Sequence, residues 1–194
     1  MRESMTFVAL MWFGILGAQT IQTFDSIKDA LASKALGVPV IHLDLTKSKL
    51  KAVPIEILEF PELKTLILDK NKLDSLPVWL PQLQKLEVLS ASNNNLTYFP
   101  HTILELRNLR ILKLGDNMID EIPIDIDNLK NLESLWLWSN VIREFPASLG
   151  EIESLKYIDL LYNDMTYDEQ TWLRDVLKDV VLELSEPCNC KFDD

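Results

Sequence analysis

A spacing of 23 residues recurs through most of the chain and restricts its fold more than any other feature. The leading column of this repeat is Leu43, Leu66, Leu89, Leu112, Leu135 and Ile158. Matching apolar columns lie three residues before it, two after it and seven after it. Only 47% of the chain is apolar, so composition alone would fill all these positions with a probability on the order of 10⁻⁸. We therefore expect the chain to stack copies of one structural unit.

A polar column stands inside each copy of the repeat. It consists of Ser48, Asn71, Asn94, Asn117, Asn140 and Asn163. An asparagine amide offers two donors and an acceptor, enough to bond backbone groups that lose their partners where a chain leaves a strand. We predict that the five asparagines stack into a structural ladder.

A proline column follows the asparagines, at Pro54, Pro77, Pro100, Pro123 and Pro146. Proline fixes its own φ and keeps the preceding residue extended, so each one should start a return path that leads away from the strand. Two further apolar columns along this path are expected to hold it against the core. They are Ile57, Leu80, Ile103, Ile126, Leu149 and Phe60, Leu83, Leu106, Leu129, Ile152.

These columns resemble the leucine-rich repeat family. Its pattern Leu-x-x-Leu-x-Leu-x-x-Asn-x-Leu, completed by Leu-Pro-x-x-Leu-x-x-Leu, can be followed from Leu109 to Leu129 with isoleucine at some positions. The resemblance implies an α/β fold: a curved, right-handed solenoid with a parallel sheet on its concave face and helical caps at both ends. Two positions depart from the pattern, Ser48 in place of asparagine and Ala91 in place of leucine.

The caps bracket six repeats over residues 40–165. The first cap is expected over residues 19–39, where apolar residues recur at helical spacing at Phe24, Ile27, Leu31 and Ala35. The second spans residues 166–194. There, Thr166 and Glu169 form a capping box that opens a helix, and Val180–Leu184 is expected to be a final strand. We interpret Trp172, on the apolar stripe of that helix, as a core residue.

Residues 1–18 are predicted to be a secretory signal. Met5–Leu16 is almost wholly apolar and too short to span a membrane, and the small residues Gly17 and Ala18 precede a plausible cleavage site. The chain is then exported to a periplasm, a cell surface or the medium. The alternative is a cytoplasmic chain whose N-terminal helix packs on the domain. In an exported chain, Cys188 and Cys190 can pair in a disulfide, although the same residues also suit an ordinary tail.

The concave face is where we expect binding, because residues beside the buried leucines point from the sheet into solvent. Its C-terminal half carries an aromatic patch, which we define as Trp136, Trp138, Tyr157 and Tyr162. Ile111, Lys113 and Asp159 stand beside it. Large aromatic side chains anchor many interfaces, so we interpret this region as a ligand-binding surface. The competing interpretation is that strand propensity and cross-strand packing account for the rings.

Charge and motifs narrow the function further. A net charge of −11 and a pI near 4.6 argue against nucleic acid and anionic membrane surfaces as partners. The sequence lacks a phosphate-binding loop, a nucleophile elbow and metal-ligand spacing, so we expect no enzyme activity, cofactor or metal, and no stable membrane insertion. We expect a non-catalytic module that binds a protein or peptide. The alternative is a carbohydrate-binding or cell-surface structural protein that uses the same aromatic patch on a glycan.

Overall fold

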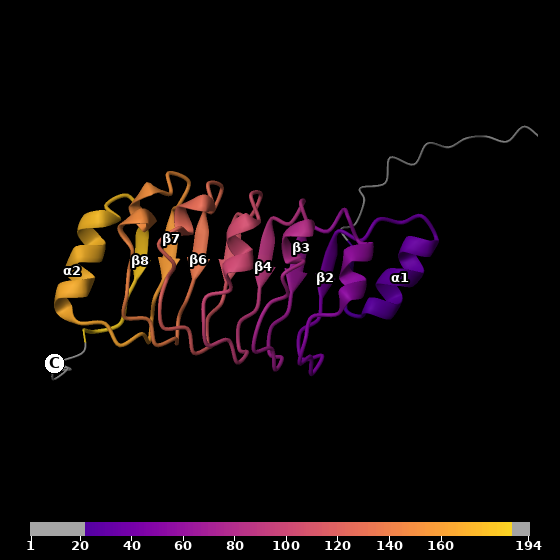
Figure 1. The fold of residues 1–194 in the computed structure, drawn as a ribbon, viewed down its shortest axis with the longest axis horizontal. Helices are drawn as coiled ribbons and strands as arrows, with labels where there is room; N and C mark the ends of the chain where they lie inside the picture. The colour runs from indigo at the N-terminus through magenta and orange to yellow at the C-terminus, as the bar shows by residue number, and fades with distance from the viewer. Residues whose placement is uncertain (1–21, 188–194) are drawn as a thin grey trace, which may run out of the picture.

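The computed structural model describes residues 22–187, which form a single row of stacked coils (Figure 1). The predicted signal and the two cysteines, Cys188 and Cys190, lie outside these residues. One parallel sheet runs through the row in sequence order, with α1 (Ile27–Ala35) at one end and α2 (Tyr167–Val176) at the other. Its strands are β1 (Thr23–Phe24), β2 (His42–Asp44), β3 (Thr65–Ile67), β4 (Val88–Ser90), β5 (Ile111–Lys113), β6 (Ser134–Trp136), β7 (Tyr157–Asp159) and β8 (Val181–Glu183). The predicted solenoid fold is confirmed.

The repeat length sets the register of the sheet. Leu43 of β2 pairs with Leu66 of β3, and the same register continues along the leading column to Ile158 of β7 and Leu182 of β8. One repeat therefore makes one full coil, which returns the chain to the same height on the next strand.

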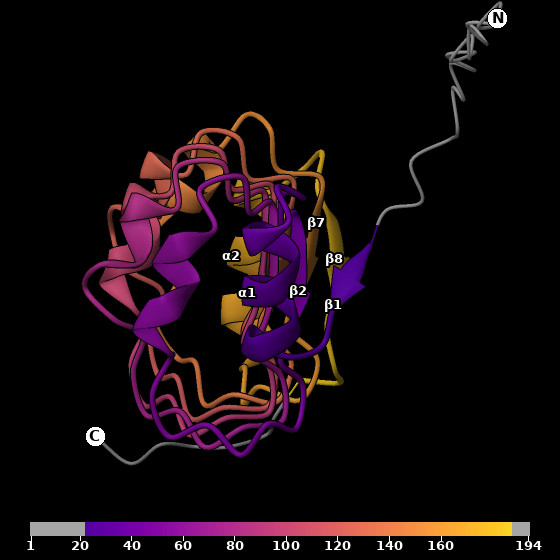
Figure 2. The ribbon, with the colours of Figure 1, turned by 90° about the vertical axis from the view of Figure 1, so that its right-hand side faces the viewer.

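The return path lies across the coil from the sheet (Figure 2). It contains the short 3₁₀ helices η1 (Ile55–Glu59), η2 (Leu80–Gln82), η3 (His101–Glu105), η4 (Ile126–Asn128) and η5 (Ala147–Glu151).

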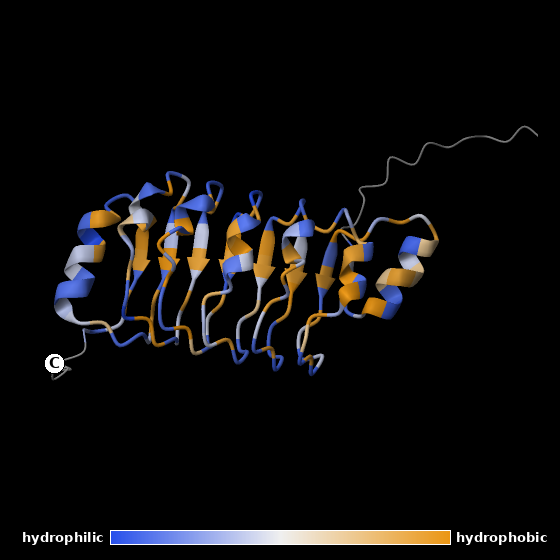
Figure 3. Cartoon of the chain, in the orientation of Figure 1, coloured by the Kyte–Doolittle hydropathy of each residue, from blue (hydrophilic) through white to orange (hydrophobic). Residues whose placement is uncertain are grey.

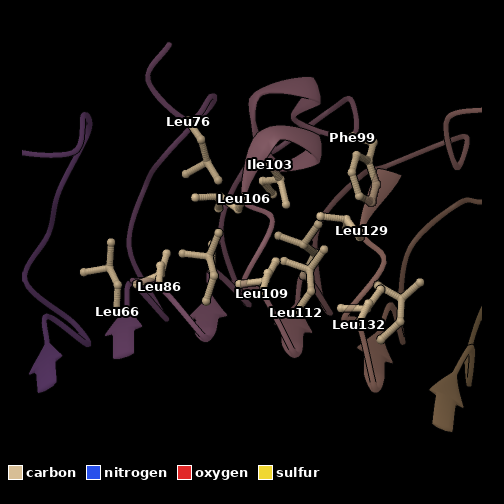
Figure 4. Packing of buried hydrophobic residues seen from close by; sticks show 14 of the residues in the cluster. Leu66, Leu76, Leu86, Phe99, Ile103, Leu106, Leu109, Leu112, Leu129 and Leu132 are labelled. Carbon is tan, nitrogen blue, oxygen red and sulfur yellow. The ribbon is translucent and has the colours of Figure 1, made fainter. Parts of the chain in front are cut away.

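The core fills the space between the strands and the return path. Leu66, Leu112 and the other leading residues have no exposed surface. They pack toward return-path residues such as Ile103 and Leu106 (Figure 4). Because both walls of every coil contribute apolar side chains, neighbouring coils share one continuous core, as expected of a solenoid.

The asparagines tie each coil to the one before it. The Nδ2 atom of Asn117 donates to the carbonyl of Leu114 in its own coil (2.9 Å) and to that of Ala91 in the preceding coil (3.1 Å). Its Oδ1 accepts from the backbone N–H of Leu96 (3.1 Å). The other asparagines make equivalent bonds, and they are Asn71, Asn94, Asn140 and Asn163. All five amides are buried, so these bonds satisfy backbone groups that water does not reach.

The N-terminal cap differs in one respect from its prediction. Helix α1 begins after Ser26, whose Oγ accepts from the N–H of Asp29 (3.1 Å), and it ends before Gly37, which has a φ of 78°. Phe24 was predicted to belong to this helix, and that prediction is wrong. Phe24 lies in β1 and pairs with Leu43, and its buried side chain joins the hydrophobic core.

The C-terminal cap shows the predicted capping box, with Thr166 and Glu169 bonded to each other through both backbone N–H groups (2.6 and 3.3 Å). Leu173 of α2 is buried against the last coil. Trp172 is 37% exposed, so its prediction as a core residue is wrong. Both helices carry hydrophilic as well as hydrophobic residues along their length (Figure 3). Each helix therefore covers an end of the core with one side and meets solvent with the other.

Candidate functional site

The central feature of the concave face is a cluster of three side chains, Lys113, Trp136 and Tyr157, which we call the Trp136 cluster. Lys113 and Trp136 are register neighbours on β5 and β6. The Lys113 Nζ lies over the Trp136 ring, 4.8 Å from its centroid. The ring of Tyr157 on β7 contacts the indole, with 4.7 Å between centroids and an interplanar angle of 44°. All three side chains are half-buried, so the indole has a defined orientation and keeps exposed surface.

Asp159 is the next residue in the same column, in register with Trp136 on one side and Glu183 of β8 on the other. It is only 6% exposed, and its Oδ1 accepts from the N–H of Leu161 (3.0 Å). Burial raises the pKa of Asp159, and the charge of Glu183 adds to this effect while the Leu161 bond opposes it. Burial also raises the pKa of Tyr157, with both carboxylates contributing. The cluster therefore borders a carboxylate held in an environment that disfavours its charge.

The other predicted site residues occupy different surroundings. Trp138 packs over Gly115, so closely that a β-carbon at Gly115 would overlap the indole. Tyr162 lies in the turn after β7 with a φ of 60° and is 73% exposed, and its N–H donates to Ser185 Oγ (2.7 Å). Ile111 is half-buried on β5, in register with Ser134. The structure thus brings Lys113, Trp136 and Tyr157 into contact, with Asp159 beside them, and gives Trp138 a packing contact of its own.

The described part of the chain has neither a metal-binding cluster nor a helix that could span a membrane. Within residues 22–187, no three histidine, cysteine, aspartate or glutamate side chains are grouped closely enough to hold a metal ion. Over the same range, neither helix has the length or the apolar character that crossing a bilayer requires.

Comparisons with known protein families agree with this geometry. A model described as "Leucine rich repeat" matches residues 61–119, and one described as "Leucine Rich repeats (2 copies)" matches residues 107–150. The chain is a leucine-rich repeat protein. The comparison with curated proteins gave no match. Leucine-rich repeat proteins are typically non-catalytic binding modules.

Solved structures similar to this leucine-rich repeat protein come from bacteria and plants. A leucine-rich repeat protein of Leptospira interrogans is 29% identical with a TM-score of 0.64, and the match covers 74% of this chain and 36% of that one. A plant peptide hormone receptor, RGFR1 in complex with RGF2, is 32% identical with a TM-score of 0.60, covering 75% of this chain and 24% of the receptor. Internalin C2 of Listeria monocytogenes is 23% identical with a TM-score of 0.61, covering 75% of this chain and 62% of the internalin, and this likeness concerns the fold alone. The chain thus spans about a third of the Leptospira protein and a quarter of the receptor.

Sequence reasoning missed a second surface of the leucine-rich repeat protein, a ladder of charges two residues before the leading residue of each repeat from Leu66 to Ile158. Lys64 pairs with Glu87 (2.7 Å), and Glu133 pairs with both Arg110 (2.5 Å) and Lys156 (3.2 Å). Hydrogen bonds from Arg110 and Lys156 lower the pKa of Glu133. The signal was present in the sequence as an alternation of sign at the repeat spacing.

Four of these charges line a groove of about 460 Å³, and they are Lys64, Glu87, Arg110 and Glu133. Lys85, Asn108, Asn131 and Ser154 complete its lining. The side chains of the ladder are solvent-accessible, and exposed ion pairs of this kind contribute little to stability. Because the charges already pair with one another, the groove is less suited to a charged ligand than the concave face.

Proposed function

We propose that this leucine-rich repeat protein is an interaction module that binds a peptide or an extended protein segment across the C-terminal half of its concave face. The observation that carries the proposal is the Trp136 cluster. The Trp136 indole lies between the Lys113 ammonium and the Tyr157 ring and remains half-exposed. An anchor whose orientation is set before binding loses less conformational entropy when a partner arrives, and tryptophan is the residue most enriched among such anchors.

Two further observations support a peptide as the ligand. At the position of Trp136, strands β2 and β4 carry Asp44 and Ser90, so the aromatic character is confined to one half of the face. A similar solved structure is a plant peptide hormone receptor in complex with RGF2. A short chain in an extended conformation suits a row of parallel strands, because its side chains can address successive columns.

A glycan is the second candidate partner, and the geometry favours it less. A sugar stacks on a flat, open ring face. In the Trp136 cluster the Lys113 ammonium lies over the indole, and the Tyr157 ring is tilted by 44° rather than coplanar. A peptide side chain can use the ring edges and the gaps between rings, so it needs no such platform.

The test is binding by the wild-type chain and two variants in the same column. The purified protein is screened against a combinatorial library of acetylated, amidated peptides and, in parallel, against a glycan array. We expect peptides to be enriched, and we expect Trp136→Ala to weaken their binding by about tenfold or more, as loss of an aromatic anchor does. Ile67→Ala, at the equivalent position of β3, is the matched control and should leave peptide affinity unchanged.

Two results would contradict the proposal. Enrichment of glycans without peptides would show that the Trp136 cluster binds a glycan instead of a peptide. A melting temperature for Trp136→Ala as low as that of a buried leucine variant such as Leu135→Ala would show that Trp136 is a packing residue, since only a buried side chain leaves a cavity when it is truncated.

A further inference from the structure

Two turns of the sheet occupy identical positions in the repeat but satisfy their aspartates differently. After β2, the Oδ1 of Asp44 accepts from both the N–H (2.9 Å) and the hydroxyl (2.5 Å) of Thr46. After β7, Leu161 stands at the position of Thr46, and among residues 22–187 its N–H is the one donor that bonds to the Asp159 carboxylate. The turn after β7 therefore leaves its carboxylate one hydrogen bond short.

Burial makes that missing bond more consequential at Asp159. Asp44 is half-buried, whereas Asp159 is almost wholly buried, and a buried carboxylate is unfavourable unless donors or a cation compensate it. Glu183, its register neighbour on β8, is a second carboxylate. No lysine or arginine within the described residues forms an ion pair with either group. Lys113, the cation of this column, is held over Trp136.

Asp159 can still be reached from the concave face. Within residues 22–187, the side-chain polar atoms that are both completely buried and unbonded are Thr102 Oγ1 and Ser148 Oγ. The Oδ2 of Asp159 has no hydrogen-bond partner among these residues either, but it is not one of these two completely buried atoms. It therefore keeps some solvent-accessible surface. A donor carried by a ligand can therefore bond to this oxygen without displacing a protein group.

We propose that Asp159 and Glu183 form a subsite for a basic side chain of the bound peptide, a lysine or an arginine, beside the rings of Trp136 and Tyr157. This inference rests on the proposed function, because it assigns a residue preference to the same face. A lysine or arginine head group supplies the donor that the turn after β7 lacks and neutralises two neighbouring carboxylates. The adjacent aromatic rings also favour a cation. Burial is the main reason that the pKa values of Asp159 and Tyr157 are raised, and neighbouring carboxylates add to both shifts.

The experiment uses the peptides selected by the full wild-type chain from the acetylated, amidated library, in which no terminal charge can imitate a side chain. We expect lysine or arginine to be enriched at one position, and we expect replacement of that residue by norleucine or citrulline to weaken binding. Asp159→Asn keeps the shape of the side chain and the Leu161 bond but removes the charge. It should weaken binding of the basic peptide about tenfold, the usual size of a charge-assisted bond, and leave the norleucine peptide unaffected.

Two further variants separate a missing donor from a general effect of charge. Leu161→Thr places after β7 the hydroxyl that Thr46 supplies after β2, and it should reduce the preference for the basic peptide. Asp44→Asn, the matched control in the turn after β2, should change nothing. Melting curves of all variants show whether each one folds.

The outcomes distinguish this inference from the proposed function. Peptides that depend on Trp136 but show no basic preference, with affinities unaltered by Asp159→Asn, would overturn the subsite and leave the interaction module intact. Failure of the library to yield any peptide would overturn both. An unchanged preference in Leu161→Thr would refute the missing-donor argument.

Discussion

The interior of the solenoid and its concave face are built from alternate residues of the same strands, yet they differ in how strictly they repeat. Leu135 on β6 is fully buried and has leucine or isoleucine at its counterparts from β2 to β8. Trp136, the next residue, has Ser90, Lys113 and Asp159 as counterparts on nearby strands. An interior side chain must fit the coils on both sides, whereas an outward one meets only its neighbours on an open surface. The inner columns therefore determine stability, and the outer columns are free to specialise.

The strongest test of this division is Asn117→Ala. The change removes two short bonds from Nδ2 to the carbonyls of Leu114 and Ala91, and it leaves the buried N–H of Leu96 without its acceptor. We expect the free energy of unfolding to fall by about 3 kcal/mol, because several buried polar groups lose their partners at once. Urea unfolding followed by circular dichroism measures the change.

The matched control is Asn95→Ala, an exposed asparagine directly after Asn94, the ladder residue of the preceding coil. It should alter the free energy of unfolding by less than about 0.5 kcal/mol. Equal losses in the two variants would mean that the ladder is not what joins the coils.

An intermediate effect is expected where the two regions meet, at Gly115. A methyl group there would overlap the Trp138 indole, so Gly115→Ala should destabilise the fold by about 1–2 kcal/mol as the ring is displaced. In a Trp138→Ala background the same change should be close to neutral, because the obstructing ring is gone. Urea unfolding of the four proteins completes the double-mutant cycle. The same cost in both backgrounds would show that Gly115 is required for its backbone rather than for Trp138.

The inner columns explain why so much of the fold could be predicted from the sequence. A spacing of 23 residues specifies the register of Leu43 with Leu66, because each coil must return to the same height. The asparagine and proline columns likewise sit where a backbone turns. The capping box at Thr166 was recognisable because it depends on local spacing alone.

The parts that could not be predicted depend on side-chain direction or on very short elements. A strand of two residues has no pattern of its own, so Phe24 was assigned to the neighbouring helix, whose apolar spacing it happens to match. Trp172 stands at the edge of the apolar stripe of α2, where one residue of rotation separates core from surface. The contact of Trp138 with Gly115 depends on how a large ring leans across the strands, which column positions do not specify. Column positions likewise do not specify that Asp159 is buried while Asp44 is half-buried.

The smallest predicted effect concerns Asp159 on the concave face and the dependence of stability on pH. Burial raises the pKa of Asp159 above its value in the unfolded chain, and Glu183 adds to the shift. The protonated form is thus favoured by folding, so stability is lost as pH rises from below about 4 through the pKa of the folded state. Asp159→Asn removes this penalty and should raise the melting temperature at neutral pH by about 2 °C, a gain that disappears at pH 3. Calorimetry at the two pH values, with Asp44→Asn as control, measures it. A gain that persists unchanged at pH 3 would mean that the variant acts through packing rather than through the charge of the concave face.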